Sequence, residues 1–187
     1  MQITPTKLPE VVEITPKRFG DHRGFFSETW NHRALADAGF DFDFVQDNHS
    51  MSATKGTLRG LHFQAPPHAQ DKLVRVVAGA VLDVAVDVRK GSPRYGQWVA
   101  VTLTAEAGNQ LLIPKGFLHG FLTLEPDTQF VYKCSDYYAP ECDGAVRFDD
   151  PTLAIDWGCD LGEVTLSEKD KVAQSFADFE SPFEYES

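Results

Sequence analysis

Cysteine and basic residues are scarce in this sequence. Its three cysteines, Cys134, Cys142 and Cys159, are odd in number and lack CxxC spacing, so neither a disulfide framework nor a zinc knuckle is indicated. Lys and Arg number 17 against 28 Asp and Glu, which gives a formal net charge of −11. Such a chain repels polyanions, so nucleic acid and anionic membranes are poor partners. An anionic ligand would need a local basic cluster.

Long hydrophobic runs are also missing. No apolar stretch approaches the ~20 residues that cross a bilayer, and the N-terminus has neither the basic nor the apolar region of a signal peptide. We therefore expect a cytoplasmic protein with no membrane partner. Because 42% of the residues are hydrophobic and 12% are aromatic, we expect residues 1–187 to fold as one domain.

Strand signals dominate the middle of the chain. The run AVLDVAVDV alternates apolar residues with a mixed set that includes Asp83 and Asp87, the period of two that is typical of a strand. Glycines separate such runs at short intervals, which favours antiparallel hairpins over βαβ crossovers. The pattern predicts an all-β sandwich or barrel. Its strands include LVRVV, AVLDVAVDV, QWVAVTLT, QLLI, FLHGFLTL and FVYK.

Helix signals are few and predict two peripheral helices. One covers residues 30–40, and the other covers residues 166–179, where Ser167 and Asp170 have capping-box spacing. Near the N-terminus, three prolines flank the run VVEI. This suits an edge strand, or an arm that reaches a partner subunit, better than a central strand.

The segment GTLRGLHFQAPPHAQDKLVRV places Arg59, His62, His68 and Lys72 close together in sequence. Arg59 and His62 are three residues apart and would face opposite sides of a regular strand, but a bulge near Gly60 would let both reach one cavity. A single strand histidine is more often a satisfied polar residue than a base. Next to Arg and Lys in an acidic chain, it marks a candidate anion site.

The segment GNQLLIPKGFLHGFLTL resembles the second cupin motif, with Gly108, Pro114, Gly116 and His119 at the expected offsets and Thr123 in place of the usual Asn. The HxH pair of the first motif in metal-binding cupins is missing. We therefore expect no bound metal. The alternative for this segment is a turn with a buried histidine.

Two further segments are open to a plain interpretation. On that interpretation, FGDHRGFFSETW would be a loop whose aromatic residues reach the core, although this explains Arg23 poorly. FVQDNHS offers Gln46 and Asn48, amides of the type that read a pyrimidine edge, or it forms an ordinary Asx-rich turn.

From about Phe19 to Asp170 the chain resembles the dTDP-4-dehydrorhamnose 3,5-epimerase family. The resemblance implies a cupin-type antiparallel β-sandwich or barrel (jelly roll) with a few short peripheral helices. It also implies inversion of C3 and C5 of a dTDP-4-keto-6-deoxyglucose, without a cofactor, by a homodimer. The sequence motifs that carry the resemblance are FGDHRGFFSETW, FVQDNHS, LRGLHFQ, QDKLVRVV, IPKGFLHGF, FVYKCSDYYAPECDGAVRFDDP and LSEKD.

The same resemblance implies the catalytic roles. His62 matches the general base, and Asp170 matches the carboxylate that holds it, although Asp170 also suits a helix cap. Lys72 matches the cation that stabilises an enolate. Tyr132 matches the proton donor, with a strand aromatic in the barrel wall as the alternative.

The implied binding residues follow from the same matches. Arg59 and Arg23 match diphosphate contacts, with Arg23 expected from the other subunit of a dimer. Asp143 stands where the family has Glu, which leaves that contact open. The other implied contacts are Glu28, Gln46, Asn48, His119 and Lys169.

The sequence alone leaves three other functions open. A cupin that epimerises only C3 or C5, or a 3,4-ketoisomerase, shares the His, Lys and Arg positions, and Tyr132 favours the full 3,5-epimerisation. A metal cupin such as a dioxygenase lacks support because the HxH pair is absent. A noncatalytic carbohydrate-binding cupin would need none of His62, Lys72 and Tyr132.

Overall fold

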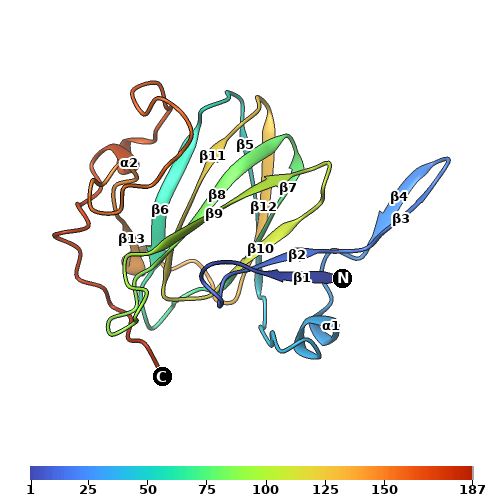
Figure 1. Cartoon of the computed structure of the whole chain (residues 1–187), viewed down its shortest axis with the longest axis horizontal. Helices are drawn as coiled ribbons and strands as arrows, with labels where there is room; N and C mark the ends of the chain where they lie inside the picture. The colour runs from blue at the N-terminus through green and yellow to red at the C-terminus, as the bar shows by residue number, and fades with distance from the viewer. Residues whose placement is uncertain (187) are drawn as a thin grey trace.

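Two antiparallel sheets stacked face to face form the body of the molecule in the computed structural model, which describes residues 1–186 (Figure 1). The strand order of the six-stranded sheet is β1 (Gln2–Pro5), β2 (Val12–Thr15), β10 (Gln110–Ile113), β7 (Lys72–Ala78), β12 (Thr128–Cys134) and β5 (Gln46–Ser52). The order of the five-stranded sheet is β13 (Asp143–Ala145), β6 (Leu58–Gln64), β11 (Phe117–Thr123), β8 (Ala80–Asp87) and β9 (Trp98–Thr104). The all-β, cupin-like fold is confirmed.

Strands β8 and β11 of the five-stranded sheet are buried on both faces, which explains their long apolar runs. Alternate residues of β8, such as Val81 and Ala85, pack toward the six-stranded sheet. The residues between them, such as Val84 and Val86, pack against the C-terminal segment, whose Trp157 belongs to the same cluster. Because β8 is covered on both sides, Asp83 and Asp87 are carried into the interior on the face that meets the other sheet.

The strands predicted between residues 72 and 132 are confirmed, but the second helix is much shorter than expected. Helix α1 (His32–Ala36) lies within the predicted range, and so does α2 (Glu168–Lys171), which ends after one turn. The prediction of a helix through residue 179 is wrong. Beyond α2, the aromatic rings of Phe176 and Phe179 pack against the core, and this tertiary packing outweighs local helix propensity.

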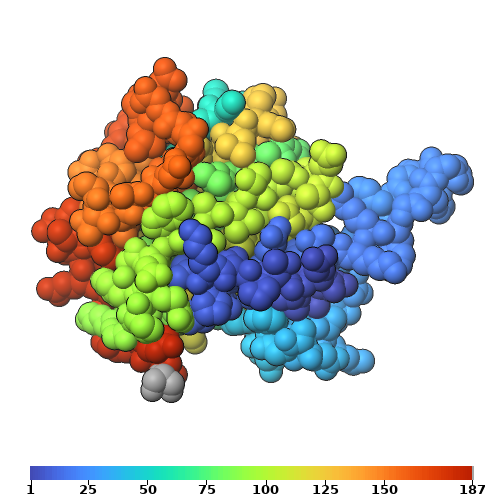
Figure 2. All heavy atoms as spheres, viewed as in Figure 1, coloured from blue at the N-terminus to red at the C-terminus, as the bar shows by residue number. Residues whose placement is uncertain are grey.

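The N-terminal expectation is confirmed only in part. β1 forms the sheet edge, but β2, which contains most of VVEI, lies between β1 and β10. An arm does exist, and it comes later in the chain. The hairpin of β3 (Arg18–Asp21) and β4 (Gly24–Ser27) projects clear of the body (Figures 1 and 2). Within residues 1–186, no helix has the length and apolar character needed to cross a membrane.

Candidate active site

A polar cavity of about 330 Å³ takes its walls from both sheets and from the segments that follow them. The six-stranded sheet contributes residues of β5, β7 and β12, and the five-stranded sheet contributes residues of β6 and β13. Eight of the residues that line it are Gln46, Asn48, His62, Gln64, Lys72, Tyr132, Asp143 and Lys169.

Strand register brings these side chains together. Tyr132 lies directly opposite Asn48, and Cys134 lies opposite both Gln46 and Lys72. Directly opposed residues in antiparallel strands point to the same face, so this register gathers Tyr132, the amides and Lys72 on one wall. The cavity is therefore assembled from residues far apart in sequence.

His62 reaches the cavity because the β6–β11 pairing is irregular. His62 pairs with His119 and Arg59 pairs with Phe121, so two residues of β6 oppose one of β11. The bulge expected near Gly60 is present, and His62 lines the cavity. Arg59 lies beside the cavity and not in its wall, with its guanidinium 3.4 Å from Ser52 Oγ.

Asp170 holds the His62 imidazole. The distance from His62 Nε2 to Asp170 Oδ1 is 2.5 Å, and the Ser167 hydroxyl donates to Asp170 Oδ2 at 2.8 Å. Burial acts to raise the pKa of Asp170, but its hydrogen bonds with His62, Ser167 and Gly60 hold that pKa below its usual value. An ionised Asp170 requires Nε2 to carry a proton, which leaves Nδ1 as the unprotonated nitrogen.

Asp170 also belongs to the helix cap, so the two arrangements considered for it coexist. The Asp170 N–H donates to Ser167 Oγ at 3.2 Å, and the Ser167 side chain caps α2. One turn of helix thus connects the cap to the His62 contact. The capping spacing that is visible in the sequence positions a carboxylate at the cavity.

Tyr132 and His62 lie on opposite walls, because β12 belongs to the six-stranded sheet and β6 to the five-stranded sheet. Burial raises the pKa of Tyr132, so its phenol stays protonated at neutral pH, although nearby Arg59 acts in the opposite direction. Burial lowers the pKa of Lys72, which Cys134, Asp143 and Asp83 act to raise.

An ion pair between Asp143 and Lys169 forms part of the cavity wall. The Tyr138 hydroxyl lies 3.5 Å from Asp143 Oδ2, and the Tyr138 backbone N–H donates to Gln46 Oε1. Gln46 in turn donates to Asn48 Oδ1 at 3.1 Å. These contacts tie the loop before β13 to β5 and to α2.

Four lining residues were not singled out from the sequence. They lie in segments that the sequence analysis had already connected with the site. Which side chains of those segments face inward depends on the direction of the strands and the course of the loops, and the sequence does not show either. Gln64 fixes the neighbouring loop, since its amide oxygen accepts from the Ala139 N–H and its Nε2 donates to the His68 and Tyr137 carbonyls. The four are Phe63, Gln64, Gln70 and Tyr138.

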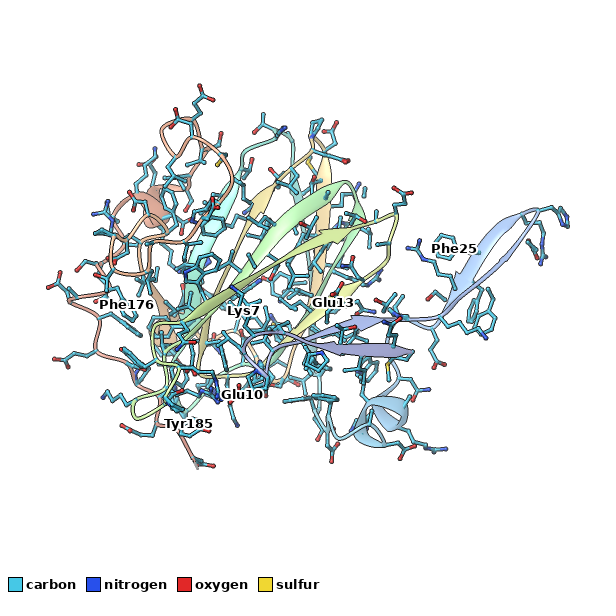
Figure 3. All side chains as sticks on the ribbon, in the orientation of Figure 1. Lys7, Glu10, Glu13, Phe25, Phe176 and Tyr185 are labelled. Carbon is cyan, nitrogen blue, oxygen red and sulfur yellow. The ribbon has the colours of Figure 1, made fainter. Side chains whose placement is uncertain are left out.

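Besides Arg59, three expected binding residues lie outside the cavity of their own chain. Arg23 is 78% exposed on the projecting arm, where it pairs with Asp21. Glu28 lines a separate pocket near the arm. His119 is buried, with Nε2 3.0 Å from Asp83, and lines a smaller hollow next to Lys72. Figure 3 labels Phe25 on the same projecting arm.

No group of three His, Cys, Asp or Glu side chains suited to holding a metal ion occurs among residues 1–186. The site offers instead an imidazole held by a carboxylate, a phenol on the opposite wall and the amine of the half-buried Lys72. These are the groups that move protons and stabilise the charge that forms when a C–H bond is ionised. Fold and site thus define an acid–base enzyme of the isomerase type.

Comparison with known proteins gives the family. The family model of dTDP-4-dehydrorhamnose 3,5-epimerase matches residues 5–178. The dTDP-4-dehydrorhamnose 3,5-epimerase of Shigella flexneri is 48% identical over 179 residues, which cover 95% of this chain and 97% of that protein. The chain belongs to the dTDP-4-dehydrorhamnose 3,5-epimerase family, and it is an isomerase of the epimerase class.

Two solved structures are close in fold. The dTDP-6-deoxy-D-glucose-3,5-epimerase of Legionella pneumophila, solved in complex with dTDP-4-keto-L-rhamnose, has a TM-score of 0.94 and 46% identity, with 100% of this chain and 99% of that chain covered. ChmJ, a 3'-monoepimerase from Streptomyces bikiniensis solved with dTDP-quinovose, has a TM-score of 0.86 and 37% identity, with 92% and 87% covered. The fold is therefore shared by enzymes that invert different numbers of centres.

Proposed function

We propose that this protein converts dTDP-4-dehydro-6-deoxy-D-glucose to dTDP-4-dehydro-L-rhamnose by inverting C3 and C5, a step of dTDP-L-rhamnose formation. The observation that supports it most directly is the His62–Asp170 pair, which faces Tyr132 across one polar cavity. The Legionella relative, bound to dTDP-4-keto-L-rhamnose, supports the choice of substrate.

The first half of the reaction is proton removal. The C4 ketone acidifies the C–H bonds on C3 and C5, and His62 takes the proton at Nδ1 while Asp170 stabilises the imidazolium. The electron pair of the broken C–H bond moves onto O4 as an enolate. The Lys72 ammonium stabilises that charge, an effect that typically contributes ~3 kcal/mol.

The second half is proton delivery to the other face. Tyr132 donates its phenolic proton to the carbon, and the electron pair of the enolate forms the new C–H bond. The tyrosinate and the imidazolium then return to their starting states by proton exchange with water. The product has the same composition as the substrate, so the reaction requires no oxidant or reductant.

Epimerisation at a single centre is the second candidate, and the similarity to the 3'-monoepimerase ChmJ is the observation that favours it. A 3,4-ketoisomerase would use the same base and cation. Tyr132 suits either epimerase, since a proton donor opposite the base is what completes an inversion at one centre or at two.

Incubation in deuterated water separates these candidates. We expect deuterium at both C3 and C5 of the product, measured by NMR. Deuterium at one carbon would assign a single-centre epimerase, and movement of the carbonyl would assign a ketoisomerase. Absence of exchange at both carbons would contradict the epimerase proposal.

We further propose that the reaction needs no metal and takes place in the cytoplasm. Activity should survive dialysis against EDTA within twofold, measured by the same NMR assay. Loss of activity on chelation, with recovery on adding a divalent ion, would overturn the metal-free mechanism.

A further inference from the structure

Asp83 is a buried carboxylate that has no role in the reaction proposed above. It lies on β8 and is 0% exposed. Both carboxylate oxygens lie 3.0 Å from His119 Nε2, and His119 is the only side chain among residues 1–186 that hydrogen-bonds to them. A buried carboxylate is strongly disfavoured unless hydrogen bonds and a nearby positive charge compensate for the lost water.

Lys72 is a cation whose charge favours the ionised form of Asp83. Lys72 and His119 line the same small hollow, and Lys72 also lines the main cavity. The groups that act on the Lys72 ammonium come from four elements: Cys134 on β12, Asp143 on β13, Asp83 on β8 and Lys169 on α2. His119 on β11 lies between Asp83 and this hollow.

Of the three acidic groups near Lys72, Asp83 is the ionisable carboxylate that pairs with no other lysine or arginine among residues 1–186. Burial raises the pKa of the Cys134 thiol, which stays uncharged at neutral pH. Asp143 is paired with Lys169. Burial also acts to raise the pKa of Asp83, and His119 and Lys72 oppose it. Asp83 is therefore linked to His119 by hydrogen bonds and to Lys72 by charge.

His119 is held in a fixed orientation between these charges. Its ring stacks on Phe130 at 6.2 Å between centroids with 24° between the planes, and Phe130 lies 5.9 Å from the Tyr132 ring. Its neighbour across the strands is His62. The contact with Asp83 fixes the remaining freedom of the imidazole, so the carboxylate acts on a ring that pairs across the strands with the base and lines the same hollow as the cation.

We propose that Asp83 is a positioning residue that fixes His119 and supplies the buried negative charge that keeps Lys72 protonated while the enolate forms. The proposal rests on the proposed role of Lys72 in epimerisation. Without that negative charge, the Lys72 ammonium would be an unneutralised cation in a buried site, and it would release its proton more readily.

The variant Asp83→Asn tests this directly. The amide oxygen can still accept from His119 Nε2, but the negative charge is gone. Because Asp83 acts to raise the pKa of Lys72, its removal lowers that pKa, and the protonated amine is lost at a lower pH. We expect the alkaline limb of the kcat profile to move down by about one pH unit, which corresponds to a ~tenfold loss of kcat on that limb.

The matched control is Asp87→Asn. Asp87 lies on the same strand and is also 0% exposed, but its carboxylate binds Arg89 and Ser92. This variant should lower the melting temperature and leave the pH profile of kcat unchanged. A wild-type profile in Asp83→Asn, or an equal displacement in both variants, would overturn the role given to Asp83.

A second measurement needs neither a folded variant nor catalysis. Labelling of the unsubstituted protein with acetic anhydride over a range of pH, followed by peptide mass spectrometry, gives the midpoint at which Lys72 loses its proton. We expect that midpoint above neutrality in spite of burial, with the exposed Lys90 as the internal reference. A midpoint at or below neutrality contradicts the proposal, whatever the outcome of the deuterium-exchange experiment.

Discussion

At the residue scale, the proposed base and acid differ in what their loss should do. His62→Ala should abolish deuterium exchange at both C3 and C5, because no enolate forms without the base. A general base typically accounts for a ~10²- to 10⁴-fold effect on rate. Tyr132→Phe keeps the ring in place but removes the proton donor. Exchange with retention should then persist at a carbon where inversion is lost.

NMR of the product formed in deuterated water measures both outcomes. Epimerisation of both centres by Tyr132→Phe at the wild-type rate would remove Tyr132 from the role of donor. Normal exchange in His62→Ala would remove His62 from the role of base. The two walls of the cavity make the test specific, since each variant alters one wall only.

Arg59 should contribute mainly to binding of the diphosphate. Its guanidinium is exposed and makes only two long contacts, at 3.4 Å, to Ser52 and to the Met51 carbonyl. Such a cation is available to an anionic ligand. Arg59→Ala should weaken dTDP binding by ~1.5–3 kcal/mol, the range for hydrogen bonds to charged groups.

Titration calorimetry with dTDP checks this, and Arg147→Ala is the control. Arg147 carries the same charge on the surface, but Asp149 neutralises it at 2.7 Å. We expect Arg147→Ala to bind dTDP as tightly as the wild type. An unchanged affinity in Arg59→Ala would exclude Arg59 from the nucleotide site.

Single residues were predictable from the sequence where they belong to a specific motif, as His62 and Lys72 do. From the sequence alone, Asp83 could be recognised only as one residue on the strand face that mixes polar and apolar side chains. Nothing in AVLDVAVDV shows that its carboxylate meets His119, because that contact depends on the pairing of β8 with β11. Tyr138 was missed for a similar reason, since it belongs to a loop whose course no periodicity describes.

At the scale of the element, the short helix α2 links stability to catalysis. The Ser167 hydroxyl caps the helix and donates to Asp170, which holds His62. Ser167→Ala should cost about 1 kcal/mol of unfolding free energy through the lost cap. It should also lower kcat by about tenfold, equivalent to ~1.4 kcal/mol, because Asp170 loses a hydrogen bond that keeps it ionised and in place.

Ser175→Ala is the matched control for this element. Ser175 and Asp178 repeat the same arrangement, with a hydroxyl donated to a carboxylate at 2.6 Å, but they lie outside the cavity lining. Thermal unfolding and steady-state kinetics on both variants separate the two effects. A wild-type kcat in Ser167→Ala would show that Asp170 does not depend on the cap.

Strands were predictable as elements because alternation and glycine spacing are local signals. The segment after β13 was not predictable in this way. Its residues, including Phe148 and Trp157, are irregular in backbone but buried against the outer face of the five-stranded sheet. Such packing is decided by the shape of that sheet, and this is also why the helix expected over residues 166–179 ends after one turn.

At the scale of the whole molecule, the projecting arm leaves the site of a single chain without Arg23. The β3–β4 hairpin carries Arg23 away from the cavity, and its Phe19, Phe25 and Phe26 are exposed. An exposed apolar arm of this kind suits contact with a second copy of the chain. We therefore expect a homodimer in which each arm completes the partner's site, with a dimeric mass in sedimentation equilibrium.

Mixed dimers decide which site Arg23 serves. We consider a heterodimer of one Arg23→Ala chain and one His62→Ala chain, isolated with two affinity tags. If each arm crosses to the partner, one site of this heterodimer has both substitutions and the other site has neither. Its activity per dimer should then be about half that of the wild type, since one intact base site remains. If Arg23 serves its own chain, each site carries one defect and the activity stays as low as in the parent variants. A heterodimer of wild-type and His62→Ala chains gives the half-activity reference in both cases, so activity well below that reference would place Arg23 with its own chain.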